Sequence, residues 1–329
     1  MRFTMTREAV RVSAETHVVA DVDAIAAAMS DGLRGEYVQL ESRPFRGRWT
    51  IVRTASSVAQ FASEDVAVAR RLRVPTARWA FIVPLDVPPA ARWNGRPVRD
   101  TDVLVCPPGT ECLAFDPPAT HYAIVTAKSD AKITGSVRSL LGSVAADPIT
   151  VACGVNLQYA RHRLARLRDR IERDQPATSI PHDEAILEAP LSACLAHAIG
   201  ARADVSMAGS KSGIVRTAEA FFRRHASEGV SVAQLSTIAG VSERSLRNAF
   251  YDVYTTSPKR YMKLWQLHQV RRALRSADVR GATVTDVATC HGFYELGRFA
   301  GAYKSLFGEA PSETLSKART QQTIQGAAF

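Results

Sequence analysis

The spacing of apolar residues divides the chain into a strand-like region and two helical regions. After a polar lead-in over residues 1–20 and a short helical stretch at 23–30, residues 36–128 consist of short β-rich runs such as RWTIVRT, RWAFIVPLD and HYAIVTA. Pro-Pro and Asn-Gly signals separate these runs, which lie too close together for βαβ crossovers. This pattern predicts a β-barrel or β-sandwich.

Helical periodicity begins after residue 127. Apolar residues recur at helical spacing over 137–144, 155–173 and 185–201, and a Pro- and Ser-containing link at 175–181 indicates a helical hairpin. We interpret the arginines of RHRLARLRDRIER as a solvated helix face, because Leu164, Leu167 and Ile171 form one apolar line. A small, polar linker over 203–213 then separates the hairpin from the C-terminal third.

Residues 213–329 contain one helix-turn-helix pattern twice. In the first copy, SVAQLSTIAG is followed by a turn at Gly240, and Ser242 caps the helix SERSLRNAFYDVY, in which Leu246 and Phe250 face inward. The second copy, TVTDVATCHGFYELGRFAGAYKSLFG, turns at Gly292. The residues expected to hold its second helix are Phe293, Leu296, Phe299 and Tyr303. Repetition makes the pattern more specific than either copy alone.

The net charge and the cysteine content limit the classes of function that we expect for this protein. The chain has 42 Lys and Arg against 32 Asp and Glu, a net charge of +10. Residues 211–329 hold 17 of the basic and 9 of the acidic side chains, or eight of the ten excess charges, which favours a polyanionic partner for this third. The five cysteines include no Cys-x-x-Cys pair, so we expect a reduced, cytoplasmic protein without a metal. We also expect no leader and no membrane span.

Side chains on the outer faces of the two repeated helices are candidates for contacts with DNA bases. Arginine can clamp guanine and asparagine can pair with adenine, so an exposed row of these residues suits the major groove. The candidates are Arg244, Ser245, Arg247, Asn248 and Tyr251 in the first copy, and Tyr294, Glu295, Arg298, Gly301 and Lys304 in the second.

A longer series of motif residues surrounds the two copies. It comprises Val241-Ser242, Leu246, Phe250, Ser257-Pro258, Tyr261, Val287-Ala288, Gly292-Phe293, Phe299, Phe307-Gly308 and Pro311-Ser312. This series resembles the AraC/XylS family of bacterial transcription regulators, in the branch that includes ethanolamine-operon regulators. Thr255 departs from the family pattern, which usually has Gly there, and Gln266 stands where Arg is usual.

The resemblance implies an α+β protein that regulates transcription. Its two recognition helices would enter successive major grooves of double-stranded DNA, about 34 Å apart, with Lys259, Arg260, Lys263 and Lys304 on the phosphates. The family pattern implies a homodimer, with RNA polymerase as a further partner of an activator. The implied domains are an arm (1–20), a cupin-like β-barrel (21–135), a dimerising helical hairpin (136–205) and a bipartite helix-turn-helix domain (211–325).

The lead-in suggests an effector. Arg7 and Arg11 form an Arg-x-x-x-Arg pair, whose guanidiniums can bind phosphate or a guanine edge. This layout is similar to the one that PilZ domains use for cyclic di-GMP, and to that of a cyclic-di-GMP-responsive AraC-like activator. An anionic dinucleotide needs further cations and aromatic platforms. Chosen by residue type, these are Arg43, Arg46, Arg48, Trp49, Arg78 and Trp79. A solvated arm is an equally open interpretation of Arg7 and Arg11.

Three alternatives remain open at this point. The effector could be a small neutral or cationic metabolite, such as an amino alcohol or a sugar, held by aromatic faces. The barrel could serve only to dimerise a constitutive DNA-binding protein. A cupin enzyme is the alternative of a different class, but His121 is the single histidine of residues 36–128, and no nucleophile–base spacing is visible. We therefore predict no catalytic residue, no metal ligand and no cofactor.

Overall fold

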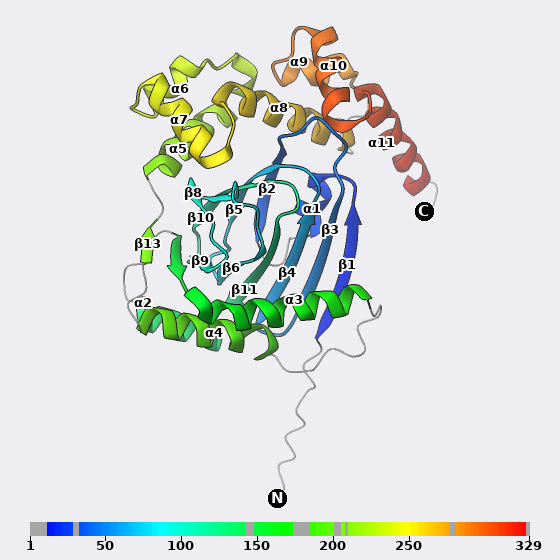
Figure 1. Ribbon diagram of the computed structural model, residues 1–329. Coiled ribbons are helices and arrows are strands. Elements are labelled where there is room, and N and C mark those ends of the chain that lie inside the picture. Colours follow the sequence, from blue (N-terminus) through cyan, green and yellow to red (C-terminus); the bar gives the residue numbers. More distant parts are fainter. Residues whose placement is uncertain are drawn as a thin grey trace, which may run out of the picture.

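The computed structural model describes residues 12–28, 33–141, 148–173, 185–200, 205–207, 210–276 and 281–326. Figure 1 shows a β-rich N-terminal half, with two long helices along one side and the C-terminal helices on the opposite side. The chain thus has the expected α+β class. Arg7 and Arg11 lie outside the described residues.

The described strands form two antiparallel sheets. The larger sheet has the order β1-β3-β4-β11-β6-β9-β12-β13, and the smaller has the order β2-β5-β10-β7-β8. The strands of the larger sheet are β1 (Ser13–Val19), β3 (Gly47–Arg53), β4 (Ser57–Glu64), β6 (Arg78–Asp86), β9 (Asp102–Cys106), β11 (His121–Lys128), β12 (Ile149–Ala152) and β13 (Val205–Met207). Those of the smaller sheet are β2 (Arg34–Gln39), β5 (Val68–Arg73), β7 (Arg92–Trp93), β8 (Arg96–Pro97) and β10 (Glu111–Asp116). No pairing among the described strands joins the two sheets into a closed barrel.

Both faces of each sheet are covered, which explains the strongly apolar strands. Successive side chains of a strand point to opposite faces. In β6, Ile82 therefore packs in the core between the sheets, whereas Phe81 packs against α3 (Leu157–Arg173) and α4 (Ala185–Gly200). Phe115 of β10 lies on the outer face of the smaller sheet and packs in the core of the C-terminal helices. The molecule is a stack of four layers: helical hairpin, large sheet, small sheet and C-terminal helices (Figure 1).

Three strands lie where the sequence pattern indicated other structure. β1 lies within the lead-in and pairs with β3, β12 lies in a region expected to be helical, and β13 lies within the expected linker and pairs with β12. β1 and β13 are the two edges of the larger sheet. β12 and β13 have four and three residues, too few for an alternating pattern to stand out. Sequence periodicity therefore misses the margins of this sheet.

Four of the C-terminal helices begin at side-chain caps. The C-terminal helices are α5 (Ser210–Arg224), α6 (Val232–Ile238), α7 (Glu243–Tyr254), α8 (Pro258–Arg275), α9 (Val284–Cys290), α10 (Leu296–Phe307) and α11 (Pro311–Gly326), and α1 (Val22–Ala28) and α2 (Lys132–Leu141) belong to the N-terminal half. Capping boxes start α6 at Ser231 and α9 at Thr283, while Ser257 caps α8 before Pro258. None of the described helices is long and apolar enough to cross a membrane.

Candidate nucleic-acid interface

The first helix-turn-helix unit consists of α6 and α7. Gly240 makes the turn with a positive φ of 66°, and the Ser242 side chain accepts a hydrogen bond from the Ser245 backbone N–H at the start of α7. Leu246 and Phe250 are buried, as their spacing predicted. The opposite face of α7 therefore lies in solvent. It carries Arg244, Arg247, Asn248 and Tyr251.

Two of the predicted base-contacting residues on α7 already have local partners. The Ser245 hydroxyl is 2.9 Å from the Ser242 hydroxyl, so it belongs to the helix cap. Arg247 forms an ion pair with Glu243 one turn earlier, at 2.5 Å. Such exposed i,i+4 pairs contribute little stability. Arg247 can therefore leave Glu243 and bind a guanine edge at a small cost in free energy. Arg244 and Asn248 can bind a base without losing any partner among the described residues.

The second unit consists of α9 and α10, with Gly292 in the turn at φ 84°. Phe299 and Tyr303 are buried and hold α10 against α8 and α11. Leu296, which was expected to pack inward, is 37% exposed, because it is the first residue of α10 and lies at the edge of the unit. Ile238, at the end of α6, is 47% exposed as well.

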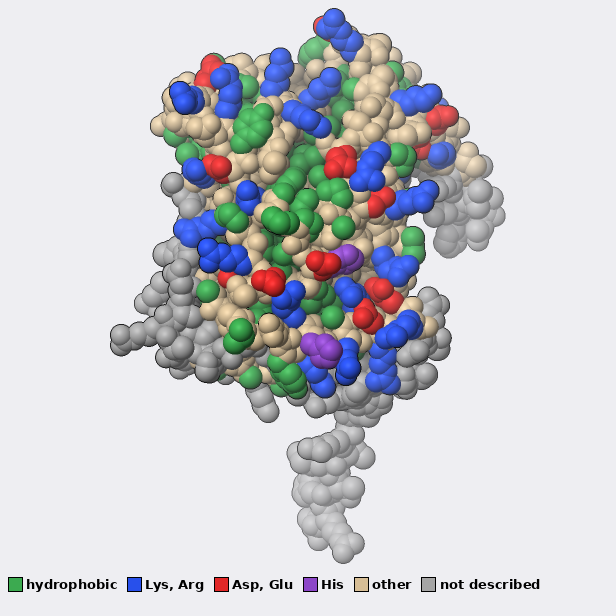
Figure 2. Space-filling model, in the orientation of Figure 1, with side chains coloured by type: hydrophobic (Ala, Val, Ile, Leu, Met, Phe, Trp, Pro, Cys, Tyr) green, Lys and Arg blue, Asp and Glu red, His purple; other side chains and the backbone are tan. Residues whose placement is uncertain are grey.

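The outer face of α10 presents two cationic hydrogen-bond donors, Arg298 and Lys304. Arg298 is 84% exposed and forms an ion pair with Glu295 at 2.6 Å. Tyr294 is exposed, and its hydroxyl donates to the Ser227 carbonyl at 3.2 Å. Lys304 and Gly301 also lie in solvent. In Figure 2, Lys and Arg side chains are spread over the C-terminal helices at the top of the molecule.

The residues expected on phosphates differ in their availability. Lys259 and Lys263, near the start of α8, are exposed and form no ion pair with a described carboxylate. The Arg260 guanidinium instead donates to the Leu40 carbonyl at 2.9 Å, at the end of β2. Arg260 thus connects α8 to the small sheet in this arrangement.

A polar contact zone between α8 and the N-terminal half escaped the sequence analysis. Arg272 pairs with Asp23 at 2.6 Å and Arg275 with Asp21 at 2.7 Å. Burial opposes ionisation of Asp21, but Arg275 keeps the pKa of this carboxyl below its usual value. Nearer the middle of α8, the Gln39 backbone N–H donates to the buried His268 Nε2 at 3.0 Å. The helix that carries both units is therefore fastened to the small sheet.

The residues predicted to bind an effector do not converge on one place. Trp49 is fully buried in the core between the sheets, whereas Trp79 packs on the other face of the large sheet with the helical hairpin. Arg78 is the first residue of β6 and directly precedes Trp79. Arg43 pairs with Glu41 at 2.7 Å and also donates to the Asp65 carbonyl. Residue type alone could not show which sheet face each side chain would occupy.

Two of these residues, Arg46 and Arg48, line a groove of about 650 Å³ together with Arg168 of α3. Arg48 forms an ion pair with Glu172 at 3.1 Å, and Arg168 pairs with Asp169 at 2.7 Å. His121 also lines the groove, and burial lowers the pKa of this imidazole. The groove, which is also lined by the carboxylates of Glu64, Asp65 and Glu172, joins the strand ends of the large sheet to the helical hairpin.

A buried ionic cluster lies between the sheets and was not anticipated. Arg70, 1% exposed, contacts Glu64 and Asp116, each at 2.5 Å, and its guanidinium lies 5.6 and 5.9 Å from the ring centroids of Tyr37 and Tyr122. Burial raises the pKa of both carboxyls, and Arg70 opposes that effect. The alternation Val68, Arg70, Leu72 could have placed Arg70 in the core, because it shares a strand face with two apolar residues.

The C-terminal units define a helix-turn-helix DNA-binding domain, and comparison with known proteins agrees. A family model described as a helix-turn-helix domain matches residues 235–317. A probable thc operon regulatory protein of Rhodococcus erythropolis is 42% identical over 103 residues, which are 31% of this chain and 31% of that protein. An XylDLEGF operon transcriptional activator of Pseudomonas putida is 35% identical over 101 residues, 31% of this chain and 32% of that protein.

Two solved structures are also similar. A probable AraC family transcriptional regulator from Rhodopseudomonas palustris is 32% identical, covers 32% of this chain and 97% of its own, and has a TM-score of 0.30. The AraC-like transcriptional activator CuxR is 11% identical, covers 84% of this chain and 100% of its own, and has a TM-score of 0.41. Residues 235–317 of this chain therefore match the helix-turn-helix domain, and the two curated relatives named above are operon regulators and not enzymes. The match spans about a third of the length of the curated relatives.

Proposed function

We propose that the protein is a sequence-specific DNA-binding transcription regulator that inserts α7 and α10 into successive major grooves. The observation that carries the proposal is the pair of exposed polar helix faces attached to one helix, α8. With 18 residues, α8 is about 27 Å long, comparable with the 34 Å repeat of the double helix. Arg244, Arg247, Asn248 and Arg298 would contact bases, and Lys259 and Lys263 would contact phosphates.

The proposed effector is cyclic di-GMP, bound in the groove of Arg46, Arg48 and Arg168. The groove's volume lies in the range of about 300–1,000 Å³ typical of small-molecule sites. Its three guanidiniums can bind two phosphates once they leave the local ion pairs with Glu172 and Asp169, and Glu64 and Asp65 are further carboxylates in the lining. Arg7 and Arg11 would add two further cations from the lead-in.

Dimerisation through the helical hairpin would link effector and DNA. Val155, just before α3, is 74% exposed, and Tyr159 in its first turn is 63% exposed. They are four residues apart, on one side of the chain, and large exposed apolar residues of this kind mark interaction surfaces. Effector binding that favours the dimer would raise the effective concentration of the second DNA-binding domain at paired half-sites. As a cytoplasmic activator, the dimer would then contact RNA polymerase.

Selection from a pool of random duplexes tests the DNA-binding part. We expect enrichment of sites with two contacted segments about 10 base pairs apart, and an affinity that falls steeply between 50 and 200 mM salt, as for any multi-phosphate contact. Failure to enrich any sequence would overturn the proposal.

Calorimetric titration with cyclic di-GMP tests the effector part separately. We expect binding by the wild type, loss in Arg46→Ala/Arg48→Ala and in Arg7→Ala/Arg11→Ala, and no change in the exposed α3 variant Arg163→Ala. Ethanolamine and arabinose serve as comparison ligands. Enrichment of duplexes without any cyclic di-GMP binding would remove this effector and leave the DNA-binding function intact.

A further inference from the structure

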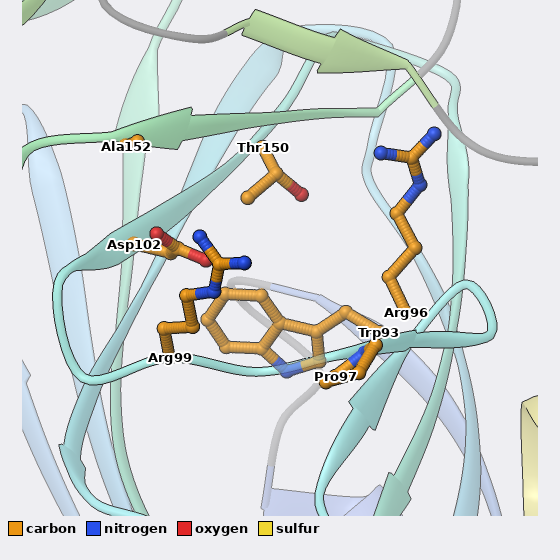
Figure 3. Close-up of a pocket in the computed structure, with 7 residues that line it drawn as sticks. All are labelled: Trp93, Arg96, Pro97, Arg99, Asp102, Thr150 and Ala152. Carbon is orange, nitrogen blue, oxygen red and sulfur yellow. The ribbon is translucent and has the colours of Figure 1, made fainter.

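A second, smaller pocket lies on the other side of the sandwich, between the β7–β8 hairpin and strands β9 and β12. Figure 3 shows its lining: the Trp93 ring and Pro97 at one side, Thr150 opposite, and Arg96 and Arg99 at the flanks. The volume is about 220 Å³, the share of roughly seven water molecules in the liquid. This space admits a molecule with one ring and one charged group.

The charges around this pocket favour an anion. Neither Arg96 nor Arg99 forms an ion pair or a side-chain hydrogen bond with any residue that the structure describes. By contrast, the three arginines of β5 are matched: Arg70, Arg71 and Arg73 each contact a carboxylate. Asp102 is the one acid among the lining residues; burial raises the pKa of its carboxyl, and the charge of Arg99 acts in the opposite direction. The two guanidiniums thus face one carboxyl.

The remaining lining sets the shape of the ligand. Trp93 is 3% exposed, and its ring lies beside Tyr122 with centroids 5.6 Å apart, so the indole is held firmly in the core. In Figure 3 the Arg99 guanidinium lies near the Asp102 carboxyl, while the Thr150 side chain points toward the space between the arginines. A rigid apolar surface beside two cationic donors and a hydroxyl suits a flat body that bears an oxyanion.

We propose that this pocket binds a small organic oxyanion, a carboxylate or a phosphate monoester on a single flat ring, between Arg96 and Arg99 with the ring against Trp93. The site is distinct from the groove of Arg46, Arg48 and Arg168 and shares no lining residue with it.

The position of the hairpin gives the site a route to DNA. Trp93 and Arg96 line the pocket, and Asn94 and Gly95 form the turn between them. A Cβ placed on Gly95 would lie 3.3 Å from Val253 Cγ2 and 3.6 Å from the Asp252 carbonyl oxygen, both in the last turn of α7. The hairpin therefore lies between the pocket and the first recognition helix. A ligand that pulls Arg96 inward shifts the turn against α7. This regulatory consequence rests on the proposed function, whereas binding itself does not.

Calorimetry on the full chain with phenyl phosphate and with benzoate tests the binding. Comparing phenyl phosphate with benzoate shows whether the site prefers a phosphate or a carboxylate. Inorganic phosphate tests the need for the ring, and benzylamine tests the need for the negative charge. We expect at least one aryl oxyanion to bind, with benzylamine inert. Arg96→Ala and Arg99→Ala should each weaken binding about tenfold, the loss of roughly 1.4 kcal/mol of charge-assisted hydrogen bonding.

The matched control is Arg92→Ala on the same hairpin. The Arg92 guanidinium contacts the Pro89 and Ala91 carbonyls and does not line the pocket, so this variant should bind like the wild type. Both pocket arginines are exposed and their variants should fold, which a thermal melt verifies. No binding of either aryl oxyanion at millimolar concentration, or equal binding by Arg96→Ala/Arg99→Ala, overturns the site.

Hydrogen exchange of backbone amides tests the route to α7. With the bound aryl oxyanion, protection of residues 250–255 should rise in the wild type and stay constant in Arg96→Ala. Binding without any change in this segment overturns the coupling. Duplex selection on the ligand-free protein, which does not involve this pocket, reports separately on the proposed DNA-binding function.

Discussion

The two helix-turn-helix units share a plan but differ in what fixes each recognition helix. α7 begins at Ser242, whose side chain caps it, and ends at Thr255, a non-glycine residue at φ 54°. α10 begins at Glu295 without a side-chain cap and ends at Gly308 at φ 73°. The N-terminus of α7 is therefore fixed by a side-chain cap, and the C-terminus of α10 by a glycine in the left-handed conformation.

The units also contact the N-terminal half through different chemistry. α7 packs its last turn on the β7–β8 hairpin and shares an apolar core with Phe115 of the small sheet. The end of α10 meets the loop after β2, where Pro44 lies against Gly308 and the Gln39 side-chain amide donates to the Leu306 carbonyl at 3.1 Å. Apolar packing tolerates small sliding, whereas the hydrogen bond from Gln39 to Leu306 fixes one position. We infer that α7 is the helix whose position a ligand can adjust.

The largest expected difference between the units concerns DNA affinity. α7 offers Arg244, Arg247 and Asn248, while Arg298 on α10 has Gly297 and Gly301 as neighbours. Each good base contact is worth about 1–3 kcal/mol. Arg247→Ala/Asn248→Ala should therefore weaken binding to a selected duplex more than Arg298→Ala, measured by gel shift at fixed salt. An equal or larger loss in Arg298→Ala would contradict the asymmetry.

Gly308→Ala should destabilise the second unit by about 1–2 kcal/mol, because an L-residue is strained at positive φ. The added Cβ would also lie 2.9 Å from Pro44 Cγ. Gly240→Ala is the matched control: its φ is 66° and no atom lies within 4 Å of its added Cβ. Urea unfolding should show a larger loss for Gly308→Ala, and equal losses would mean that the Pro44 contact does not matter.

Acid should loosen the contact between α8 and the small sheet through His268. Burial, and then Arg272 and Arg271, hold the pKa of His268 well below its usual value, while Asp21 and the Gln39 N–H act in the opposite direction. A histidine with a lowered folded-state pKa binds a proton more readily when unfolded, so stability falls as pH drops below about 6.5. The loss at pH 5 should be on the order of 1 kcal/mol.

Thermal melts between pH 7.5 and 5 test the role of His268. His268→Gln should lose less stability over this range than the wild type, and His162→Gln, an exposed site on α3, should follow the wild type. An unchanged pH slope in His268→Gln would show that other groups govern the acid response.

The helix caps should give a smaller contrast. Ser242→Ala removes the hydrogen bond to the Ser245 backbone N–H at 3.1 Å and should cost about 1 kcal/mol. Glu295→Ala removes no cap hydrogen bond and should be nearly neutral for folding. Urea unfolding of the two variants compares them directly, and a cost for Glu295→Ala that matched Ser242→Ala would refute the difference in capping.

The smallest effect should be a gain. Thr255→Gly removes the backbone strain of a left-handed conformation at the end of α7 but also increases the conformational entropy of the unfolded chain. We therefore expect a net stabilisation of about 0.5 kcal/mol. Chemical denaturation measures it, with Thr256→Gly as a control at a buried neighbour without positive φ. A destabilised Thr255→Gly would show that the Thr255 side chain has a role of its own.

Local patterns predicted the DNA-binding units well. The i,i+4 pair Leu246 and Phe250, the Ser242 cap and the Gly292 turn all depend on residues within one helical turn, and the structure has them as expected. Contacts between distant segments left no such signal. Arg260 bonds to Leu40, 220 residues away, and Arg272 to Asp23, so their partners could not be deduced from spacing.

The effector prediction shows a second limit of sequence. The arginines and tryptophans that were selected by residue type lie in three places: the groove, the core between the sheets and the layer next to the helical hairpin. They are separated because neighbours along a strand, such as Arg48 and Trp49, point to opposite faces of the sheet. A pocket built from Trp93, Arg96 and Arg99 was missed, since hairpin residues were interpreted only as turn signals. The register of strand pairing decides which residues of neighbouring strands lie opposite each other, and it is set by the whole sheet.

The Arg70 cluster gives the sandwich a mechanical property. Arg70, Glu64 and Asp116 occupy the centre between the sheets with ion pairs that cannot stretch without leaving a buried charge unmatched. The two sheets are therefore locked face to face and resist sliding over each other. A ligand at either edge therefore moves the sandwich as one stiff block or bends only its margins, and the β7–β8 hairpin, which meets α7 at Val253, is one of these margins.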